Sequence, residues 1–451
     1  MTRLITFRRP GLSRAGRFVL AGALSLGAAA CDSDEILDVP DPDVATPESV
    51  QDKAALSAVL AGAIGDFTVA YSGQSGGDSQ ISLSALFTDE FQWAETFPTR
   101  QEVDIRSVQP VNVTMDGLFR NVQRARTSAA RAADGFARFD PIASGYGEAL
   151  NLEGTVYNLI GENYCSGVPF SELVDGQTTY GNPLPRDSIF TRAVVRADSA
   201  LKVLGVATGA AFADQRFFAR IVKGRALVNL GQHAAAAAAV AGIPTNFQYS
   251  AVHSENSARQ HNGIFSLVYE GRRFTVSDSE GGNGLPFRTQ QDSRTPNARG
   301  TGSLASGFDG TTPLFLEQKY PARTTAVTVA SGIEARLIEA ESSLRAGNFA
   351  SALATLDALR AGGGLTSLTD PGTTAARENL LFRERAYWLW LTSHRLGDMR
   401  RLVRQYGRNA ETVFPTGPFF KGGVYGPDVN FPIPFDETNN PNFTTCLDRN
   451  A

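Results

Sequence analysis

A repeating hydrophobic pattern marks residues 379–403 as an amphipathic helix. At a period of 3.6 residues one stripe of this segment is apolar, and it consists of Phe382, Ala386, Leu389, Leu396, Met399 and Val403. The opposite face is charged, with Arg383, Glu384, Arg385, Arg395, Asp398, Arg400 and Arg401. Asp398 is three residues from Arg395 and Arg401, so ion pairs on the helix surface are expected. A helical glycine costs about 1 kcal/mol relative to alanine, so Gly397 implies that packing holds this segment.

Two segments share a second pattern, which consists of a helix, a turn ending in glycine and an Ala-rich helix. They are residues 216–240, with Gly231 in the turn, and residues 333–359, with Gly347 in the turn. Small residues after each glycine let two helices approach closely. This pattern is typical of a tetratricopeptide hairpin, which buries its apolar face against neighbouring hairpins. The two copies are too far apart for a regular array, so we expect an interrupted array with an insert.

The rest of the pattern predicts more helices and one loop-rich region. Further helices are predicted at 48–71, 81–88, 114–136, 147–163 and 189–204. Residues 94–109 are polar, contain Pro98 and are predicted to form an exposed loop. The insert at about 244–330 is rich in Gly, Ser, Asn and Thr, with short β-like pieces at 264–269 and 326–329. The predicted class is therefore mostly α, a tetratricopeptide-like helical-hairpin scaffold (an α/α superhelix) with a loop-rich insert.

Composition and charge narrow the range of partners. The chain has 451 residues, 20% of them charged, and a formal net charge of −4. Residues 1–30 contain five arginines and no acidic residue, so the remainder is more acidic than the total suggests. A mildly acidic surface argues against nucleic acid as a partner.

The N-terminus has the order of an export signal. A basic stretch is followed by the apolar residues 18–26 and by small residues that run directly into Cys31. This order resembles a bacterial lipobox, which predicts a signal peptide at 1–30 and an acylated Cys31 that holds the protein to a membrane. The alternative is an ordinary signal peptide cut after Ala30. Residues 31–47 are acidic and proline-containing and are interpreted as a tether, so residues 48–451 form the body.

Two cysteines remain in the body, Cys165 and Cys446. In an exported protein two spare cysteines suggest one disulfide. The alternative is two buried thiols that do not meet. The residues alone leave both possibilities open.

Several motifs together resemble the SusD/RagB family of nutrient-binding lipoproteins. The C-terminal signature of that family matches in spacing at Glu384, Arg385, Leu389, Arg395, Asp398, Arg400 and Arg401. The chain departs from it at Trp388, Thr392-Ser393 and Met399. Further similarity lies at 164–169 (with one extra residue), at 185–188 and at 431–441. These pieces follow the family order along almost the whole body.

The resemblance implies a function without covalent chemistry. Proteins of this family are outer-membrane lipoproteins, so a lipid-anchored location at the cell surface is expected. The resemblance implies that the protein binds an oligosaccharide, or a peptide, and delivers it to a SusC-like TonB-dependent β-barrel transporter. A different class of function is also open, a helical-repeat lipoprotein that docks other proteins and takes no small ligand.

Candidate catalytic and metal sites are few. The chain has four histidines, none in an HxH or HExxH pattern, and no CxxC, so neither a metal site nor a cofactor is expected. Residues 73–77 match G-x-S-x-G around Ser75, but a nucleophile elbow requires a buried strand before the serine, and 66–71 is a poor strand. Asp89, Glu90 and Glu95 could be considered as a glycosidase carboxylate pair. Carboxylates at these spacings are common on solvated surfaces, so they do not indicate catalysis. We therefore predict no catalytic residues, with a hydrolase at Ser75 as the hypothesis to exclude.

A binding site is the stronger expectation. Sugars offer hydroxyls and apolar C–H faces, so a glycan site needs exposed aromatic rings beside polar side chains. The first candidates are Trp93 and Phe97 with Arg100 and Gln101. The second group consists of Tyr71, Tyr269, Arg272 and Phe274. Trp93 has an alternative role as a core residue at a helix end, and Trp388 and Trp390 are interpreted as core.

Overall fold

The computed structural model describes residues 52–174, 177–443 and 446. The predicted signal peptide (1–30) and tether (31–47), including Cys31, lie outside the described residues. Everything described falls within one compact unit, residues 49–451. The division of the chain into signal peptide, tether and body stays a prediction.

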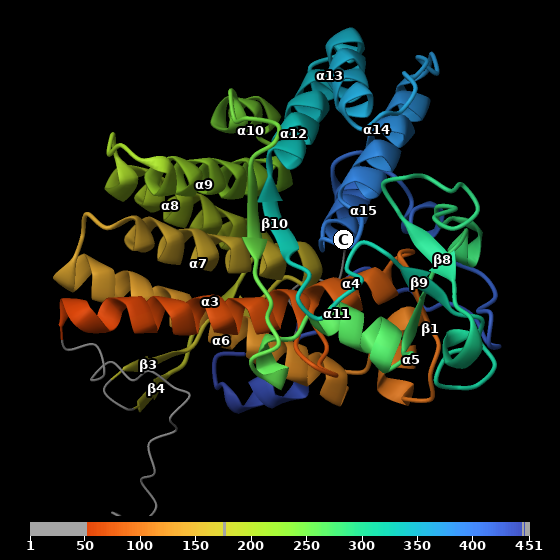
Figure 1. The fold of residues 1–451 in the computed structure, drawn as a ribbon, viewed down its shortest axis with the longest axis horizontal. Coiled ribbons are helices and arrows are strands. Elements are labelled where there is room, and N and C mark those ends of the chain that lie inside the picture. Colours follow the sequence, from red (N-terminus) through yellow and green to blue (C-terminus); the bar gives the residue numbers. More distant parts are fainter. Residues whose placement is uncertain (1–51, 175–176, 444–445, 447–451) are drawn as a thin grey trace, which may run out of the picture. The chain divides into compact units, whose positions relative to one another are not determined.

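Long helices stacked side by side form the first half of this unit (Figure 1). They are α3 (Leu56–Ser72), α6 (Val113–Phe139), α7 (Ser144–Asn163) and α8 (Arg186–Leu204). Consecutive members pack against each other, α3 on α6, α6 on α7 and α7 on α8. Close approach is set by small residues, because a Cβ at Gly161 of α7 would lie 2.7 Å from the ring of Phe190 on α8. The predicted helices at 48–71, 114–136, 147–163 and 189–204 are confirmed, with shifted ends.

The segment Lys53–Ser72, which includes the short helix η2 (Lys53–Ala55) and α3, is long and apolar enough to cross a membrane by length and composition. Its apolar character has a second explanation in the fold. Val59, Ala63 and Phe67 are buried, and α3 packs on α6 and α7. The composition of α3 is therefore that of a core helix.

The two predicted hairpins are confirmed. The first consists of α9 (Ala210–Asn229) and α10 (His233–Val240), and the second of α12 (Gly332–Arg345) and α13 (Phe349–Gly362). Both turn glycines have left-handed backbones, with φ of 74° at Gly231 and 78° at Gly347. Helix α10 packs on α12, so the hairpins are neighbours in space although the insert separates them in sequence. The mostly α class with tetratricopeptide-like hairpins is thus confirmed.

Short antiparallel strand pairs organise the insert. Strand β6 (Gln248–Ala251) pairs with β10 (Val327–Ser331), which confirms the β-like piece at 326–329 and joins the two ends of the insert. Strand β8 (Asn297–Arg299) pairs with β9 (Phe315–Glu317). Strand β7 (Phe274–Val276) pairs with β1 (Phe91–Trp93), which lies outside the insert. The pairing of β7 with β1 therefore fixes the insert to an element outside it, whereas the other two pairs lie within the insert.

Two local predictions are wrong. Residues 264–269 are not a strand but a helical turn, α11 (Gly263–Phe265), followed by the π-helix η4 (Ser266–Glu270), because the Asn262 side chain caps the turn by accepting from the Phe265 N–H at 3.0 Å. Residues 94–109 are not an exposed loop, since they contain α5 (Pro98–Asp104). Proline at the first helical position suits this start, and Val103 and Asp104 are buried. The predicted helix at 81–88 is confirmed as α4 (Gln80–Phe87).

The segment 379–403 is two helices rather than one. Helix α14 (Thr374–Trp388) ends before a six-residue linker, and α15 (Arg395–Arg404) follows it. Leu391 and Ser393 in this linker have φ of 52° and 60°, which no continuous helix allows. Trp390, interpreted as core, is fully buried in the linker, and Trp388 is half-buried.

The charged face of this segment is also not on the surface. Asp398 accepts from Arg385 Nε at 2.7 Å and from Arg401 Nη2 at 2.6 Å, and all three side chains are buried. Arg401 also pairs with Glu341 of α12. The expected pair of Asp398 with Arg401 is present, whereas Arg395 turns to Asp89 at the end of α4. Carboxylates from neighbouring helices neutralise the arginines and allow their burial.

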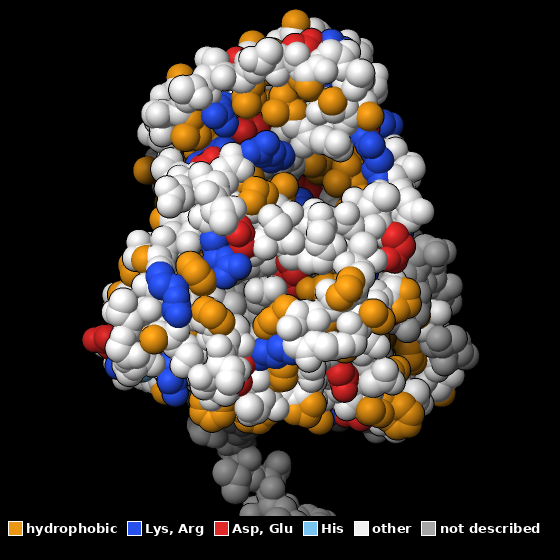
Figure 2. Space-filling model, turned by 90° about the vertical axis from the view of Figure 1, so that its right-hand side faces the viewer, with side chains coloured by type: hydrophobic (Ala, Val, Ile, Leu, Met, Phe, Trp, Pro, Cys, Tyr) orange, Lys and Arg blue, Asp and Glu red, His pale blue; other side chains and the backbone are white. Residues whose placement is uncertain are grey.

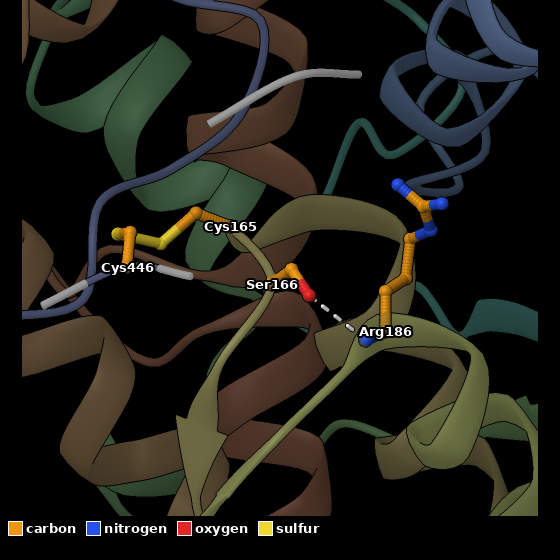
Figure 3. Close-up of a disulfide and its surroundings, with 4 residues drawn as sticks. All are labelled: Cys165, Ser166, Arg186 and Cys446. Carbon is orange, nitrogen blue, oxygen red and sulfur yellow. Dashed lines mark hydrogen bonds between the residues drawn. A yellow bond between two sulfur atoms is a disulfide. The ribbon is translucent and has the colours of Figure 1, made fainter. Parts of the chain in front are cut away.

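The C-terminal tail returns to the end of α7. The Cys165 N–H donates to the carbonyl of Phe431 at 2.9 Å, and the Phe431 N–H donates to the carbonyl of Asn163 at 2.7 Å. Cys165 and Cys446 form a disulfide with their Cα atoms 5.9 Å apart (Figure 3). Beside it, the Ser166 hydroxyl accepts from the backbone N–H of Arg186 at 3.1 Å, which ties this turn to the start of α8.

Four further strands follow this turn in the sequence, in two antiparallel pairs. Strand β2 (Val168–Pro169) pairs with β5 (Pro183–Leu184), and β3 (Glu172–Val174) pairs with β4 (Gln177–Thr179). The remaining elements are short helices: η3 (Ala258–Gln260), η5 (Glu280–Gly282), η6 (Gly302–Leu304), η7 (Ala410–Thr412) and η8 (Phe435–Asn439).

Candidate ligand-binding site

Three exposed phenylalanines from distant parts of the chain surround a small set of cations. Phe97 before α5, Phe308 between β8 and β9, and Phe420 in the tail are 50%, 46% and 45% exposed. The Arg273 guanidinium lies over both the Phe97 ring (5.1 Å) and the Phe308 ring (4.0 Å). We call these three rings the aromatic surface. The side of the molecule that carries β8 and β9 faces the viewer in Figure 2, where hydrophobic side chains are interspersed with charged ones.

Backbone hydrogen bonds hold two of these rings side by side. The Ala94 N–H donates to the carbonyl of Arg273 at 2.8 Å, and the Phe308 N–H donates to the carbonyl of Arg272 at 2.9 Å. Gly307 permits this contact, because a Cβ there would lie 2.2 Å from the carbonyl oxygen of Ala94. The position of Phe308 therefore requires glycine at residue 307.

Lys421 connects the third ring to Trp93. Its ammonium lies 3.9 Å from the centre of the Trp93 ring and 5.4 Å from that of Phe420, and it pairs with Asp309. Trp93 itself is only 7% exposed. The Trp93 ring thus lies beneath Lys421. Its burial fits the alternative interpretation of Trp93 as a core residue better than a role as an exposed binding surface.

A cavity of about 490 Å³ opens beside Phe97. Its wall includes Ser75, Arg100, Glu270 and Arg273. Arg100 donates to Asp78 at 2.9 Å and to Glu95 at 2.8 Å, and Arg273 donates to Glu95 at 3.0 Å. Burial raises the pKa of the Glu95 carboxyl, and the two arginines lower it in part. Each cation of the site is thus already paired with a carboxylate of the protein, which leaves little free charge for an ionic ligand.

The other predicted site residues have different positions. Gln101 is half-buried on α5. Tyr71 is fully buried, and its hydroxyl donates to the carbonyls of Thr328 (2.8 Å) and Thr392 (3.0 Å), so its assignment to a surface site is wrong. Phe274 is likewise buried, in β7. Tyr269 donates to the carbonyl of Glu317 at 2.5 Å, and Arg272 donates to that of Ser303 at 3.1 Å. These bonds fix Tyr269 and Arg272, which flank the wall residues Glu270 and Gly271 in the sequence.

Comparison with known proteins identifies the fold. No protein-family model and no curated protein matches the sequence. Among solved structures, a SusD superfamily protein from Parabacteroides distasonis matches with a TM-score of 0.65 at 13% identity, over 88% of this chain and 99% of that one. A laminarin-binding SusD-like protein matches with a TM-score of 0.64 at 16% identity, over 88% and 99%. A SusD-like carbohydrate-binding protein from Bacteroides vulgatus gives 0.62 at 12% identity, over 87% and 97%.

The chain has the SusD fold. The similarity extends over nearly the full length of these structures, so it includes the insert as well as the helical hairpins. The fold implied by the motifs at 384–401 and 431–441 is thereby confirmed.

Within this SusD fold the candidate catalytic groups have structural roles. Ser75 follows helix α3 rather than a strand, so the nucleophile-elbow geometry is absent and the hydrolase hypothesis loses its basis. Asp89 and Glu90 are buried, the first paired with Arg395 and the second accepting from the Leu391 N–H at 2.8 Å. Within the described residues no group of three His, Cys, Asp or Glu could hold a metal ion.

Sequence reasoning missed Phe308, Phe420, Arg273 and Lys421. Phe308 stands in Gly-Phe-Asp-Gly and Phe420 in Phe-Phe-Lys-Gly. An aromatic residue inside a glycine-rich loop has few neighbours that could bury it, and this was the available signal. Phe308 and Phe420 come together only through contacts between distant parts of the chain. Local sequence patterns do not predict such contacts.

Proposed function

We propose that this protein binds a neutral oligosaccharide at the aromatic surface. The observation that carries the proposal is the group of Phe97, Phe308 and Phe420, about half exposed and backed by Arg273 and Lys421. Soluble proteins seldom leave such rings together on a surface without a partner. Two proteins of similar fold are described as laminarin-binding and as carbohydrate-binding, which supports the same class of ligand.

The chemistry of the site suits a sugar chain. Phenyl faces contact the apolar C–H faces of pyranose rings, and the carboxylate and guanidinium edges beside them can exchange hydrogen bonds with hydroxyls. Glu95 and Asp309 already neutralise Arg273 and Lys421, which favours an uncharged glycan over a charged peptide. Binding of this kind involves no covalent step, so the ligand leaves unchanged.

We further propose that the protein is an outer-membrane lipoprotein, anchored through Cys31, that passes the glycan to a SusC-like TonB-dependent β-barrel. The lipobox-like residues before Cys31 and the SusD fold support this location and partner. In this scheme the protein acts as the lid of the transporter and releases its ligand when the lid closes.

The binding proposal is tested by a glycan and peptide array followed by calorimetry with laminarin as the first probe. Phe97→Ala and Phe308→Ala are each expected to weaken the binding of a positive glycan about tenfold, since each removes one stacked ring. The matched control is Tyr180→Ala, which removes a 45% exposed ring next to β4, at the other end of the molecule from α5 (Figure 1), and should change affinity less than twofold.

The outcomes separate the hypotheses. Equal losses for Tyr180→Ala and Phe97→Ala would refute the aromatic surface as the site. An array without any glycan signal would favour the protein-docking alternative. For delivery, affinity purification from membranes is expected to recover a large β-barrel, and mass spectrometry is expected to find diacylglycerol on Cys31. An unmodified N-terminus would refute the anchor.

A further inference from the structure

A second cavity, of about 230 Å³, lies apart from the aromatic surface. It forms where β6, β10, the first turn of α12 and the α14–α15 linker meet, and its wall includes Gln248, Lys319, Thr328, Glu334, Trp388 and His394. None of the three phenylalanines of the aromatic surface contributes to it. Gln248 on the cavity wall is an exposed residue, so the cavity reaches the protein surface.

Lys319 is the cation of this cavity, and the protein provides it with few partners. Its ammonium donates to the carbonyl of Trp390 and lies 5.5 Å from the Tyr320 ring. Within the described residues it forms no ion pair at 4.0 Å or less. A lysine ammonium has three N–H donors, so part of this capacity is unused.

The two carboxyl groups whose charge acts on Lys319, those of Glu90 and Glu317, do not supply a full counter-charge. Burial raises the pKa of Glu90 to about 8 and that of Glu317 to about 7, so both are partly protonated near neutral pH. Burial also lowers the pKa of Lys319 to about 8. An unpaired charge in such surroundings is unfavourable, and an added anion would stabilise it.

Glu334, the acid on the cavity wall, is in the opposite situation. Its Oε1 lies 3.1 Å from His394 Nε2, and the other nitrogen of His394 lies 2.9 Å from the Thr392 hydroxyl. Burial alone would raise the pKa of Glu334, but His394 and nearby arginines hold it below its usual range. The indole Nε1 of Trp388, in contrast, is buried without a hydrogen-bond partner. The cavity wall therefore has spare donors, while its acid is already satisfied.

The backbone around the cavity is irregular in two independent places. Leu391 and Ser393 adopt left-handed conformations in the linker. The pairing of β10 with β6 shifts register between Thr328 and Ala330, which puts the bulge residue Val329 on the cavity wall. Strained residues and bulges of this kind cluster at ligand sites. Trp390 lies in this helix break, and its buried carbonyl accepts from Lys319.

We infer that this cavity is a second ligand site, for a small hydroxylated carboxylate of monosaccharide size whose carboxylate binds Lys319. The volume lies below the range that holds drug-sized ligands, which excludes an oligosaccharide. The Thr328 hydroxyl accepts from the Gln248 amide at 2.6 Å, and the remaining hydrogen-bonding capacity of these two groups suits the hydroxyl groups of a sugar acid. This inference does not depend on glycan binding at the aromatic surface.

Calorimetry on the purified full-length protein tests the assignment, with glucuronate as the probe and glucose as its uncharged counterpart. Glucuronate is expected to bind, and glucose to bind at least about tenfold more weakly, because it lacks the charge-assisted bond to Lys319. Lys319→Met should weaken glucuronate binding about tenfold. Lys223→Met, the same change at a lysine that Asp198 neutralises and that lies in neither cavity wall, should leave glucuronate binding within twofold. No glucuronate binding, or equal binding of both sugars, would overturn the assignment.

A measurement on the unaltered chain covers the case in which Lys319→Met does not fold. Reductive methylation followed by mass spectrometry is expected to modify Lys319 in the free protein and less in the presence of glucuronate, whereas Lys53, whose side chain is 69% exposed, should be modified equally in both. Equal labelling of Lys319 with and without glucuronate contradicts the proposal. A Lys319 that resists labelling in the free protein also contradicts it, since the cavity would then be closed to small solutes.

Discussion

Arg395 binds Asp89 through two parallel hydrogen bonds, from Nε to Oδ1 and from Nη2 to Oδ2, each 2.7 Å long. Both side chains are buried. Asp89 Oδ2 also accepts from the Leu285 N–H of the insert at 2.8 Å. One carboxylate thus joins α4, α15 and the insert, directly before strand β1, which leads to Trp93. This pair positions the base of the aromatic surface.

Removing one partner of this pair should be far more costly than removing both. Arg395→Met leaves the Asp89 carboxylate buried without its cation, so we expect a loss of about 3–5 kcal/mol in the free energy of unfolding. The double variant Arg395→Met/Asp89→Leu should lose clearly less, because no uncompensated charge remains. Urea denaturation followed by circular dichroism measures both. Lys223→Met, which breaks an exposed pair with Asp198, is the control and should cost less than about 1 kcal/mol. Additive losses in the double variant would contradict this account.

The hairpins could be predicted from the sequence because their signals are local. Gly231 and Gly347 mark turns that need left-handed backbones, and the small residues after them permit close packing. The burial of Arg395 and Arg401 could not be predicted in this way. Periodicity assigns charged positions to solvent, whereas their partners lie elsewhere in the chain, Asp89 in the turn after α4 and Glu341 on α12. The helix break at Leu391 and Ser393 could not be predicted either, because neither residue type favours a φ above zero.

The candidate site shows the same limit. Phe97 and Arg100 stood in a polar stretch and were named from the sequence, but Phe308 and Phe420 join them only through tertiary contacts such as Asp309 with Lys421. The exposure of Phe97 fits its assignment, and its role in binding stays a prediction. For Trp93 the sequence left a surface role and a core role open, and the structure, in which the residue is 7% exposed, favours the core role.

The disulfide encloses most of the body, and its loss should lower stability. Cys165 and Cys446 are 281 residues apart, so the bond restricts a very long loop in the unfolded chain. The expected loss for Cys165→Ser/Cys446→Ser is about 2–5 kcal/mol, with native helical content retained because the helix packing does not involve the bond. Thermal unfolding with and without reductant measures it. The double variant should be insensitive to reductant, and a wild-type protein equally insensitive would show that the bond does not form.

A pair of buried carboxyl groups behind Trp93 should make stability fall as pH rises. The Asp104 carboxyl accepts from the backbone N–H of Trp93 at 2.8 Å, and the Glu280 carboxyl accepts from the Tyr425 hydroxyl at 2.8 Å. Burial raises the pKa of Asp104 to about 7, and burial together with Asp104 raises that of Glu280 well above its usual range. Raised carboxyl pKa values give stability that is present below the unfolded-state values near 4 and is lost as pH rises through about 7.

Comparing variants isolates this effect from other titrating groups. For each proton that the folded state retains and the unfolded state has lost, the free energy of unfolding falls by about 1.4 kcal/mol per pH unit. Asp104→Asn keeps a carbonyl acceptor for Trp93 and removes one titration, so its stability relative to the wild type should increase between pH 5 and pH 8. Urea denaturation at several pH values measures the difference. A constant difference across this range would mean that Asp104 is ionised throughout.

Gly397 should be required for the contact between α15 and α7. A Cβ at this position would lie 3.0–3.1 Å from the side-chain carbons of Glu162, which is itself fixed by Arg225 at 2.8 Å. Alanine is favoured over glycine in a helix by about 1 kcal/mol, so intrinsic propensity alone predicts that Gly397→Ala stabilises. We expect the opposite sign, a loss of about 1–3 kcal/mol, because Glu162 cannot move without disturbing a buried ion pair. Gly117→Ala in α6 is the matched control, since no atom other than its own helix backbone and chain neighbours lies within 4 Å of its added Cβ, and it should stabilise by up to about 1 kcal/mol. If chemical denaturation shows both variants stabilised, the close packing at Gly397 does not constrain the fold.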